Sequence, residues 1–363
     1  MEGPPEGREL RSGFTTGTAA TAAAVAAASI LLRRPTPARV PVTLPGGEQL
    51  EIEVKESSIL NTDEAMAIVI KDAGDDPDVT NKTEIGAIVR KRSEPGLLHI
   101  IGGLGVGRVT KPGLAVPPGQ WAINPGPRAM LNDNLRPLMR PGLLPGLEVE
   151  IFVEKGEELA PQTLNPRLGI LGGISILGST GLVKPFSNQA YLDTISSSLD
   201  VARALSLTEV VLTTGRQSEK LGRAARKDLP VEAFVQIADF FGDSLALAAE
   251  RGFTTVGLVS FFGKAVKQAA GHHNTHAHKN DQEPASLAEW FEDRISLETA
   301  RELGQALTAR GALDVMREAG IMPLTELVAL RALNSARSFA GPDLKLWMII
   351  FDYDGRILSS ASI

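Results

Sequence analysis

Three threonines crowd the start of an alanine-rich segment near the N-terminus. Thr15, Thr16 and Thr18 lie in the stretch "GFTTGTAATAAAVAAA", residues 13–28. A helix N-terminus exposes up to four N–H groups and carries about half a positive charge, so it attracts anions. The hydroxyls add donors, and Gly17 lets backbone approach a ligand closely. We therefore predict that the three threonines bind a ligand, with a capped core helix as the alternative.

Small polar loops follow apolar runs in the second half of the chain. In an open parallel sheet, ligands bind beyond the carboxyl ends of the strands, where helix N-termini present N–H groups. One such loop is typical of a tight turn, whereas four together indicate a site. The loops are 178–181, 213–216, 239–243 and 262–264. The predicted cofactor-binding residues are Gly178, Ser179, Thr180, Gly181, Thr214, Gly215 and Asp239.

A glycine-rich run, "HIIGGLGVG" at 99–107, is similar to the cofactor-binding turn of methyltransferases and to a dinucleotide fingerprint. Both motifs need a helix directly afterwards. Here Pro112, Pro117 and Pro118 follow and exclude that helix. We therefore predict a glycine-rich hairpin or bulge at this point.

Four of the five histidines fall in "GHHNTHAH". They are His272, His273, His276 and His278. Histidine is the commonest metal ligand, but the segment has no cysteine, no H-E-x-x-H spacing, and only Asp281 and Glu283 nearby. We predict no protein-bound metal and a polar loop in which His276 faces the crevice.

Composition narrows the class of protein. The chain has 363 residues, 43% of them hydrophobic, a net charge of −6 and no cysteine. It can bury a full core, and its length favours two domains. A disulfide framework and a cysteine nucleophile are excluded, and no basic run favours nucleic acid. The N-terminus does not look like a secretory signal, and the alanine-rich stretch is too short for a membrane span, so we expect a cytoplasmic protein.

The elements that must position these residues change character near residue 166. Before it, alternating apolar residues and Pro-Gly turns predict an α+β two-layer domain, 1–165, with a mostly antiparallel sheet. After it, short apolar strands alternate with helices, which predicts a Rossmann-like, three-layer parallel-sheet domain over 166–363. Its first strand region is "RLGILGGISILGSTG". A helical tail and a C-terminal hairpin turning at Asp354-Gly355 end the chain.

Several segments together carry a family resemblance. They are "GFTTGTAATAAA", "DPDVT", "GVGRVTKPGL", "INPGPRAM", "NPRLGILGGISILGSTGLVKPFS", "TTGR" and "NTHAH". This series closely resembles the cobalt-precorrin-5B (C1)-methyltransferase family of anaerobic cobalamin biosynthesis. The resemblance implies methyl transfer from S-adenosylmethionine to ring carbon C1 of a cobalt-containing tetrapyrrole. It also implies a two-domain α+β and Rossmann-like architecture.

The implied substrate carries many carboxylates, which the threonine-capped helix and basic side chains would bind. The predicted substrate-binding residues are Thr15, Thr16, Thr18, Arg108, Lys111, Arg128, Arg216 and Lys264, with Arg167 and Lys184 as further cations. Catalytic residues stay unassigned, with Asp239 and His276 as candidates. Asp239 is also the expected acidic contact of the cofactor's ribose or amino group.

Two residues depart from the family's usual pattern. Ala19 stands where the family usually has cysteine, and His272 and His273 stand where it usually has apolar residues. Two other functions stay open at this point. The first is an NAD-dependent oxidoreductase, which the absence of a dinucleotide-binding fingerprint in the second half disfavours. The second is a non-catalytic carrier that binds cobalt tetrapyrrole. A homo-oligomer is left open.

Overall fold

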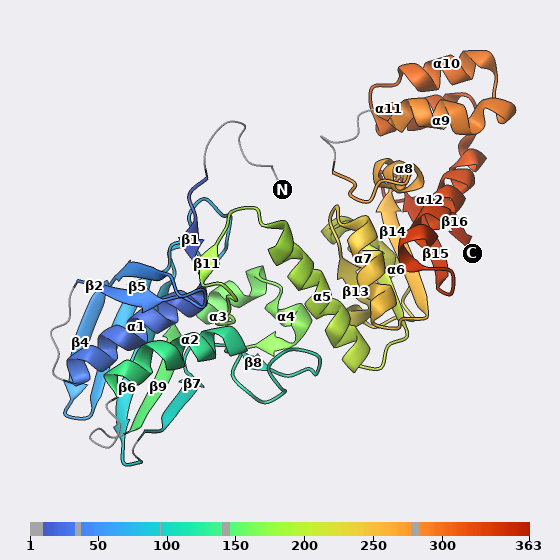
Figure 1. Ribbon diagram of the computed structural model, residues 1–363. Coiled ribbons are helices and arrows are strands. Elements are labelled where there is room, and N and C mark those ends of the chain that lie inside the picture. The colour runs from blue at the N-terminus through green and yellow to red at the C-terminus, as the bar shows by residue number, and fades with distance from the viewer. Residues whose placement is uncertain (1–9, 33–37, 95, 140–145, 277–282) are drawn as a thin grey trace. The chain divides into compact units, whose positions relative to one another are not determined.

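The computed structural model describes residues 10–32, 38–94, 96–139, 146–276 and 283–363. The chain forms two compact units, Met1–Asn188 and Gln189–Ile363 (Figure 1). The α/β class predicted from the sequence is confirmed.

The first unit is built on a five-stranded sheet. Its strands are β4 (Glu56–Asn61), β5 (Glu64–Ile70), β6 (Glu84–Arg92), β9 (Gly146–Val153) and β7 (Leu98–Gly102), in that spatial order. Every pair is antiparallel except β7 with β9. A hairpin of β2 (Arg39–Thr43) and β3 (Gln49–Glu53) adds to this unit. The predicted antiparallel sheet is therefore found, with one parallel pair.

The alanine-rich helix α1 (Thr16–Leu31) lies at the centre of the first unit. It packs on β5 and β6 and also contacts α2 (Pro125–Leu135), as Figure 1 shows. Fifteen of its sixteen residues are buried. Alanine has the strongest helix propensity and the smallest β-carbon-bearing side chain, so the helix stays stable while its backbone approaches neighbours on all sides. Close packing explains the alanines.

The threonines at the start of α1 bond to the chain itself. Thr15 caps the helix, its hydroxyl accepting from the Thr18 amide at 3.2 Å. The Thr16 hydroxyl accepts from the Leu177 amide at 2.9 Å, and the Thr18 hydroxyl donates to the Gly181 carbonyl at 2.7 Å. All three side chains are buried. These contacts favour the capped core helix, and a ligand role for the threonines stays a prediction.

The segment after residue 165 differs from the prediction. It does not enter a parallel sheet but folds back onto the first unit. There β10 (Ile170–Leu171) pairs with β8 (Arg108–Val109), and β11 (Leu182–Val183) pairs with β1 (Gly13–Phe14). The expected boundary at 165/166 is accordingly replaced by a division at 188/189. Glycine-rich apolar runs form short bridges as readily as buried strands, and periodicity does not distinguish them.

Short helical turns complete the first unit. They are α3 (Gly156–Leu159), α4 (Asn165–Leu168) and the 3₁₀ turns Arg136–Leu138 and Ala160–Gln162. The run at 99–107 forms β7, then a turn and a bridge at Val106, and leads into β8 without a helix. No helix follows the run directly, as expected, but the expected hairpin is not formed, because β7 pairs with β9 and β8 pairs with β10.

The second unit contains the other five-stranded sheet, in the order β13 (Phe234–Gln236), β12 (Glu209–Thr213), β14 (Thr255–Phe261), β15 (Lys345–Phe351) and β16 (Ile357–Ser362). The first four strands are mutually parallel, and β16 is antiparallel to β15. The predicted terminal hairpin therefore joins this sheet, turning at Gly355 with φ 89°.

Helices cover both faces of that sheet. Val211 and Val259 pack with Leu221 of α6 (Arg216–Ala225) on one face. The other face packs on α5 (Asn188–Ala204), α7 (Phe241–Glu250), α8 (Phe262–Ala269) and α12 (Thr325–Ala340). The remaining helices are α9 (Glu283–Phe291), α10 (Leu297–Gln305), α11 (Ala309–Glu318) and the 3₁₀ turns Val231–Ala233, Glu292–Arg294 and Met322–Leu324. The predicted alternation of strands and helices is thus found.

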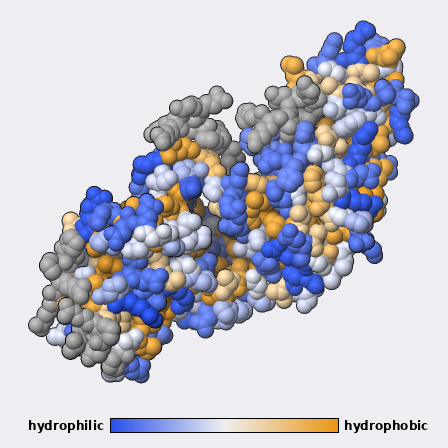
Figure 2. All heavy atoms as spheres, in the orientation of Figure 1, coloured by the Kyte–Doolittle hydropathy of each residue, from blue (hydrophilic) through white to orange (hydrophobic). Residues whose placement is uncertain are grey.

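Apolar side chains are mainly enclosed within the two units. On the face that Figure 2 shows, hydrophobic and hydrophilic residues are interspersed in small patches. Across the described residues, none of the helices has the length and apolar character needed to cross a membrane.

A buried ion pair holds the acidic loop after β5. Lys71 is 1% exposed, and its Nζ bonds to Asp78 Oδ2 at 2.7 Å. Asp78 Oδ1 accepts from the amide and the hydroxyl of Thr80, both at 2.7 Å. Burial raises the pKa of Asp78, but the nearby Lys71 charge and these hydrogen bonds outweigh it and hold that pKa below its ordinary value. The pair thus fixes this loop.

We expect Thr16→Val to lower the free energy of unfolding by about 1–3 kcal/mol, because the buried Thr16 hydroxyl is the acceptor of the Leu177 amide. Thr21→Val is the matched control, since the Thr21 hydroxyl donates only within the same helix, to Gly17 at 2.9 Å. Urea denaturation measures both. Equal losses in the two variants would show that the link to Leu177 adds no stability.

Asp78→Asn should lower the free energy of unfolding by about 3 kcal/mol near neutral pH, because Lys71 stays buried without a counter-charge. A folded-state pKa held low contributes stability above the ordinary value of about 3.9 and loses it as the pH falls through the folded pKa. The difference from wild type should therefore be constant above about pH 5 and shrink below about pH 4. The exposed Asp63, which pairs with Lys91 at 3.3 Å, supplies the control Asp63→Asn. A deficit for Asp78→Asn that does not change with pH would contradict the assignment.

Candidate functional site

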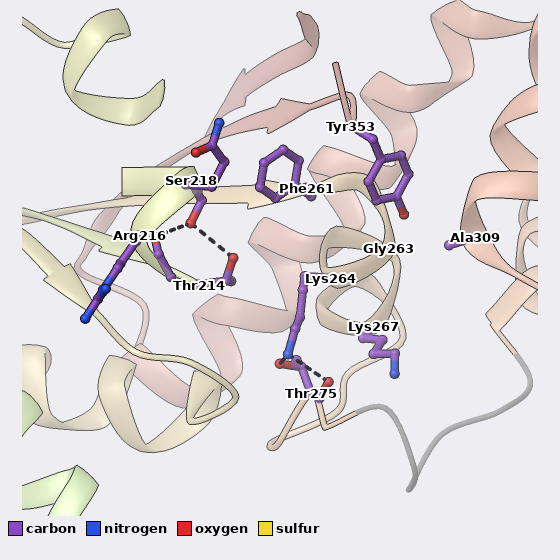
Figure 3. Close-up of a pocket in the computed structure, with 12 residues that line it drawn as sticks. Thr214, Arg216, Ser218, Phe261, Gly263, Lys264, Lys267, Thr275, Ala309 and Tyr353 are labelled. Atoms are coloured by element: carbon purple, nitrogen blue, oxygen red, sulfur yellow. Dashed lines mark hydrogen bonds between the residues drawn. The ribbon is translucent and has the colours of Figure 1, made fainter. Parts of the chain in front are cut away.

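A pocket of about 540 Å³ opens at the carboxyl ends of β12, β14 and β15 in the second unit. The strand order places a switch point between β12 and β14, because the chain moves from β12 to β13 on one side and from β14 to β15 on the other. Ligands bind at such points in open α/β sheets. The lining residues are Thr214, Gly215, Arg216, Gln217, Ser218, Phe261, Gly263, Lys264, Lys267, Thr275, Ala309 and Tyr353, most of which Figure 3 labels.

Two of the predicted loops and the histidine-rich segment meet in one polar network beside this pocket. Lys264, in the first turn of α8, forms an ion pair with Asp239, which follows β13. The Lys264 Nζ also donates to the Thr275 carbonyl at 3.2 Å (Figure 3). The Thr275 hydroxyl donates in turn to Asp239 Oδ1 at 3.3 Å. Asp239 is therefore a partner of Lys264, and among the described residues it does not itself line the pocket.

The β12–α6 loop forms a second wall. The Thr214 hydroxyl bonds to the Ser218 hydroxyl at 3.3 Å, and Ser218 donates to the Gly215 carbonyl at 2.9 Å. Residues 215–218 are the start of α6, whose N-terminal amides carry a partial positive charge. A β-carbon added at Gly215 would meet nothing within 4 Å, so this position faces open space.

The lining of the pocket is positively charged. Arg216, Lys264 and Lys267 line it, and within the described part of the chain no acidic side chain does. Lys267 is 7% exposed. This lining, with Lys264 paired to Asp239, favours an anionic group on the ligand.

Two aromatic rings form a further wall. Phe261 ends β14, and Tyr353 lies two residues beyond the end of the neighbouring parallel strand β15. The two rings are nearly parallel, with centroids 6.1 Å apart and an interplanar angle of 3°. Arg310 lies over the Tyr353 ring at 4.4 Å. Figure 3 shows both rings at the edge of the pocket. Such faces suit a planar ligand group.

Sequence reasoning missed several of these residues. They are Gln217, Ser218, Phe261, Lys267, Ala309 and Tyr353. Phe261 directly precedes the predicted loop 262–264, so extending that loop by one residue finds it. Lys267 is one helical turn after Lys264. Tyr353 had no such signal, because its place depends on β15 lying beside β14. Ala309 had none either, because its place depends on α11 packing against α8.

The predicted loop Gly178–Gly181 does not follow a strand of the parallel sheet. It belongs to the first unit and lies beside the N-terminus of α1. Gly178 has φ 129°, and a β-carbon there would come within 2.5 Å of Thr15 side-chain atoms. The expectation that Gly178, Ser179, Thr180 and Gly181 share one sheet edge with Thr214 and Asp239 is therefore wrong. Glycine at 178 is needed for close packing on α1.

The predicted cations divide between the units. Arg216 and Lys264 line the pocket, whereas Arg108, Lys111 and Arg128 are in the first unit. Arg128 donates to the carbonyls of Ile123 and Ile100 at 3.0 and 3.1 Å, and burial lowers its pKa. Lys111 donates to the Arg167 carbonyl at 3.3 Å, and Lys184 is exposed.

The histidine segment lies close to Asp239. The His276 amide donates to Asn274 Oδ1 at 3.1 Å, and His273 Nδ1 is 3.7 Å from Asp243 Oδ2. His278 and Asp281 lie outside the described residues. Among residues that the structure does describe, no group of three or more histidine, aspartate or glutamate side chains could hold a metal ion.

Comparisons with known proteins agree along the chain. A family model described as CbiD matches residues 4–185, and one described as CbiD, C-terminal domain, matches 274–362. A protein of Nitratidesulfovibrio vulgaris is 42% identical over 374 residues, covering 99% of this chain and 95% of its own. A protein of Geobacter sulfurreducens is 41% identical over 361 residues, covering 97% of this chain and 99% of its own. Both are named cobalt-precorrin-5B C(1)-methyltransferase.

A solved structure is also similar to this chain. It is the crystal structure of the cobalamin biosynthesis protein (cbiD) from Archaeoglobus fulgidus. That protein is 27% identical, the match covers 86% of this chain and 85% of that one, and the TM-score is 0.38.

Proposed function

The chain belongs to the CbiD family of cobalt-precorrin-5B C(1)-methyltransferases, and from this we propose that it methylates C1 of cobalt-precorrin-5B to give cobalt-precorrin-6A. The methyl donor in this proposal is S-adenosylmethionine, and cobalt enters as part of the substrate. Relatives that match nearly the whole chain at about 40% identity and are named for this activity support the assignment. A cytoplasmic location remains a proposal from the sequence.

We propose further that the second unit is Rossmann-like and that the cofactor binds in the pocket at the switch point of its parallel sheet. The geometry of the pocket is the main support for this cofactor site. Its volume of about 540 Å³ lies within the range typical of small-molecule sites. It combines aromatic rings, small hydroxyl side chains and cations, and the cofactor correspondingly has a planar base, a ribose and a carboxylate.

Each wall of the pocket suits one part of that cofactor. The rings of Phe261 and Tyr353 offer faces for the adenine base. The start of α6, with Arg216, suits the carboxylate, because amides and guanidinium both donate to it. Lys264, held by Asp239, and Thr214 remain for the ribose. Asp239 therefore acts in this proposal by positioning Lys264, and His276 stays a candidate contact of the substrate.

The chain's own task in this reaction is alignment. S-adenosylmethionine supplies a methyl group on a sulfonium, which is already activated for in-line displacement. Holding two reactants in line is worth about 7–11 kcal/mol of the barrier. The bonded network of Lys264, Thr275 and Asp239 restricts the motion of the side chains that would hold the donor. No strong general base is required by this chemistry.

Cofactor binding should depend on the aromatic wall. Tyr353→Ala should weaken binding of S-adenosylhomocysteine about tenfold, because base–aromatic stacking contributes about 1–3 kcal/mol. Tyr353→Phe keeps the ring and should bind within twofold of wild type. Isothermal titration calorimetry measures both. Equal affinity of Tyr353→Ala and wild type for S-adenosylhomocysteine would show that adenine does not stack on the Tyr353 ring.

The polar side of the pocket supplies an independent measurement. Thr214→Val and Asp239→Asn should both weaken S-adenosylhomocysteine binding, whereas Thr254→Val should not. Thr254 is an exposed threonine directly before the opposite end of β14. If Thr214→Val and Asp239→Asn bind normally and stay folded by circular dichroism, the cofactor site lies elsewhere.

Turnover tests the whole assignment. The purified chain, given methyl-labelled S-adenosylmethionine and cobalt-precorrin-5B, should transfer the label to C1, as detected by mass spectrometry and NMR. Binding of both ligands without transfer would favour a carrier. Binding of NAD in place of S-adenosylmethionine would favour an oxidoreductase.

A further inference from the structure

Three chain segments of the first unit lie side by side at Arg108. This residue is the Cα partner of Leu171 in the β8–β10 pair, and on its other side it is bridged to Trp121. Directly opposed residues of an antiparallel pair project to the same face. Trp121, Arg108 and Leu171 therefore form one row, which we call the Arg108 platform.

The platform is the outer face of a ribbon with a packed inner face. Val109 and Ile170, the neighbouring pair in the register, are buried at 1% and 6% exposure. They belong to a small apolar cluster with Val116 and Ala122. Leu171, by contrast, is 53% exposed, and Arg108 is exposed as well. The ribbon is thus anchored from below and presents an apolar side chain beside a charged one.

Arg108 is held in a defined place on this face. Its guanidinium lies 3.9 Å from the centroid of the Trp121 ring, and its Nη1 donates to the Gly119 carbonyl at 2.9 Å. The indole rests on Gly102, where an added β-carbon would come within 2.8 Å of the ring. A guanidinium has five N–H donors in a fixed plane, so a stacked arginine suits bidentate binding of a carboxylate.

A second cation follows shortly after this strand. Lys111 follows β8, and its Nζ reaches the Arg167 carbonyl at the end of α4. Thr110, between the two cations, bonds through its amide and hydroxyl to the Gly169 carbonyl, both at 2.7 Å. A ligand of matching chemistry would have an apolar surface and a carboxylate at its margin.

We propose that the Arg108 platform binds the tetrapyrrole substrate, with Arg108 bonded to a peripheral carboxylate and Leu171 and Trp121 against the macrocycle. This rests on the proposed function, which supplies an anionic, largely apolar ring system as the occupant. Charge complementarity and the apolar row favour that occupant over a nucleic acid, and the chain's net charge of −6 does as well. Trp121 and Leu171 thereby become substrate-binding residues that the sequence did not indicate.

Kinetics with cobalt-precorrin-5B test the platform. Arg108→Met should raise KM for this substrate about tenfold or more with kcat nearly unchanged, because a charge-assisted contact made in ground and transition state alike is lost. Leu171→Asn should raise KM in the same direction. Both should bind S-adenosylhomocysteine as wild type does in calorimetry. The control is Arg92→Met, since Arg92 is 53% exposed and lies on β6 of the same unit.

The outcomes separate the platform from the proposed function. If wild type methylates cobalt-precorrin-5B but Arg108→Met and Leu171→Asn keep the wild-type KM, the platform alone is overturned. If wild type neither binds nor methylates this substrate, the proposed function fails and the platform with it. If Leu171→Asn alters the sedimentation of the free chain while KM is unchanged, the row is a contact between copies, which also overturns the proposal.

Discussion

The near-complete burial of one small-residue helix is the constraint on which the first unit depends. A helix enclosed on all sides cannot satisfy its first N–H groups with water, so the chain itself must supply partners. For α1 these partners come from residues far away in the sequence, since the Gly17 amide donates to the Leu177 carbonyl and the Thr15 amide to that of Gly181. The segment 175–181 is therefore fixed beside the start of α1. This requirement explains both the threonines and the glycines that face them.

A different constraint builds the pocket of the second unit. Parallel strands end at one edge, so loops separated by long stretches of chain are gathered there without any local signal. Thr214, Asp239 and Lys264 follow three different strands, yet Asp239 and Lys264 form an ion pair and Thr214 lines the same pocket as Lys264. The sheet topology brings these loops together, and their side chains determine the charge of the pocket. Three cations and no acidic side chain among the described residues line the pocket, which favours an anionic ligand group.

Much of this could be predicted from the sequence, and the failures have one physical cause. The strands and helices of 188–261 were found because alternation of apolar runs with helical periods is a local property. The loops after β12, β13 and β14 followed from that alternation. The segment 170–183 was assigned to the wrong unit because its apolar, glycine-rich residues could pair with an edge strand of either unit. Its position depends on which strands it pairs with, and the sequence pattern does not show that. Tyr353 was missed for the same reason, since its nearness to Phe261 depends on β15 pairing with β14.

The contacts that a side chain makes in the fold therefore decide its possible role more than its residue type does. Arg108 and Arg128 have the same side chain and are both in the first unit. The guanidinium of Arg128, however, donates to two backbone carbonyls, and burial lowers its pKa. Arg108 stacks on an indole and stays exposed, a state in which a guanidinium keeps its affinity for carboxylates. Sequence reasoning could only assign the two the same role. Their surroundings differ, because the guanidinium of Arg128 is held by the backbone and that of Arg108 is exposed on the indole with one bond to the Gly119 carbonyl. That difference is the physical basis for proposing that the substrate binds at the ribbon of β8 and β10.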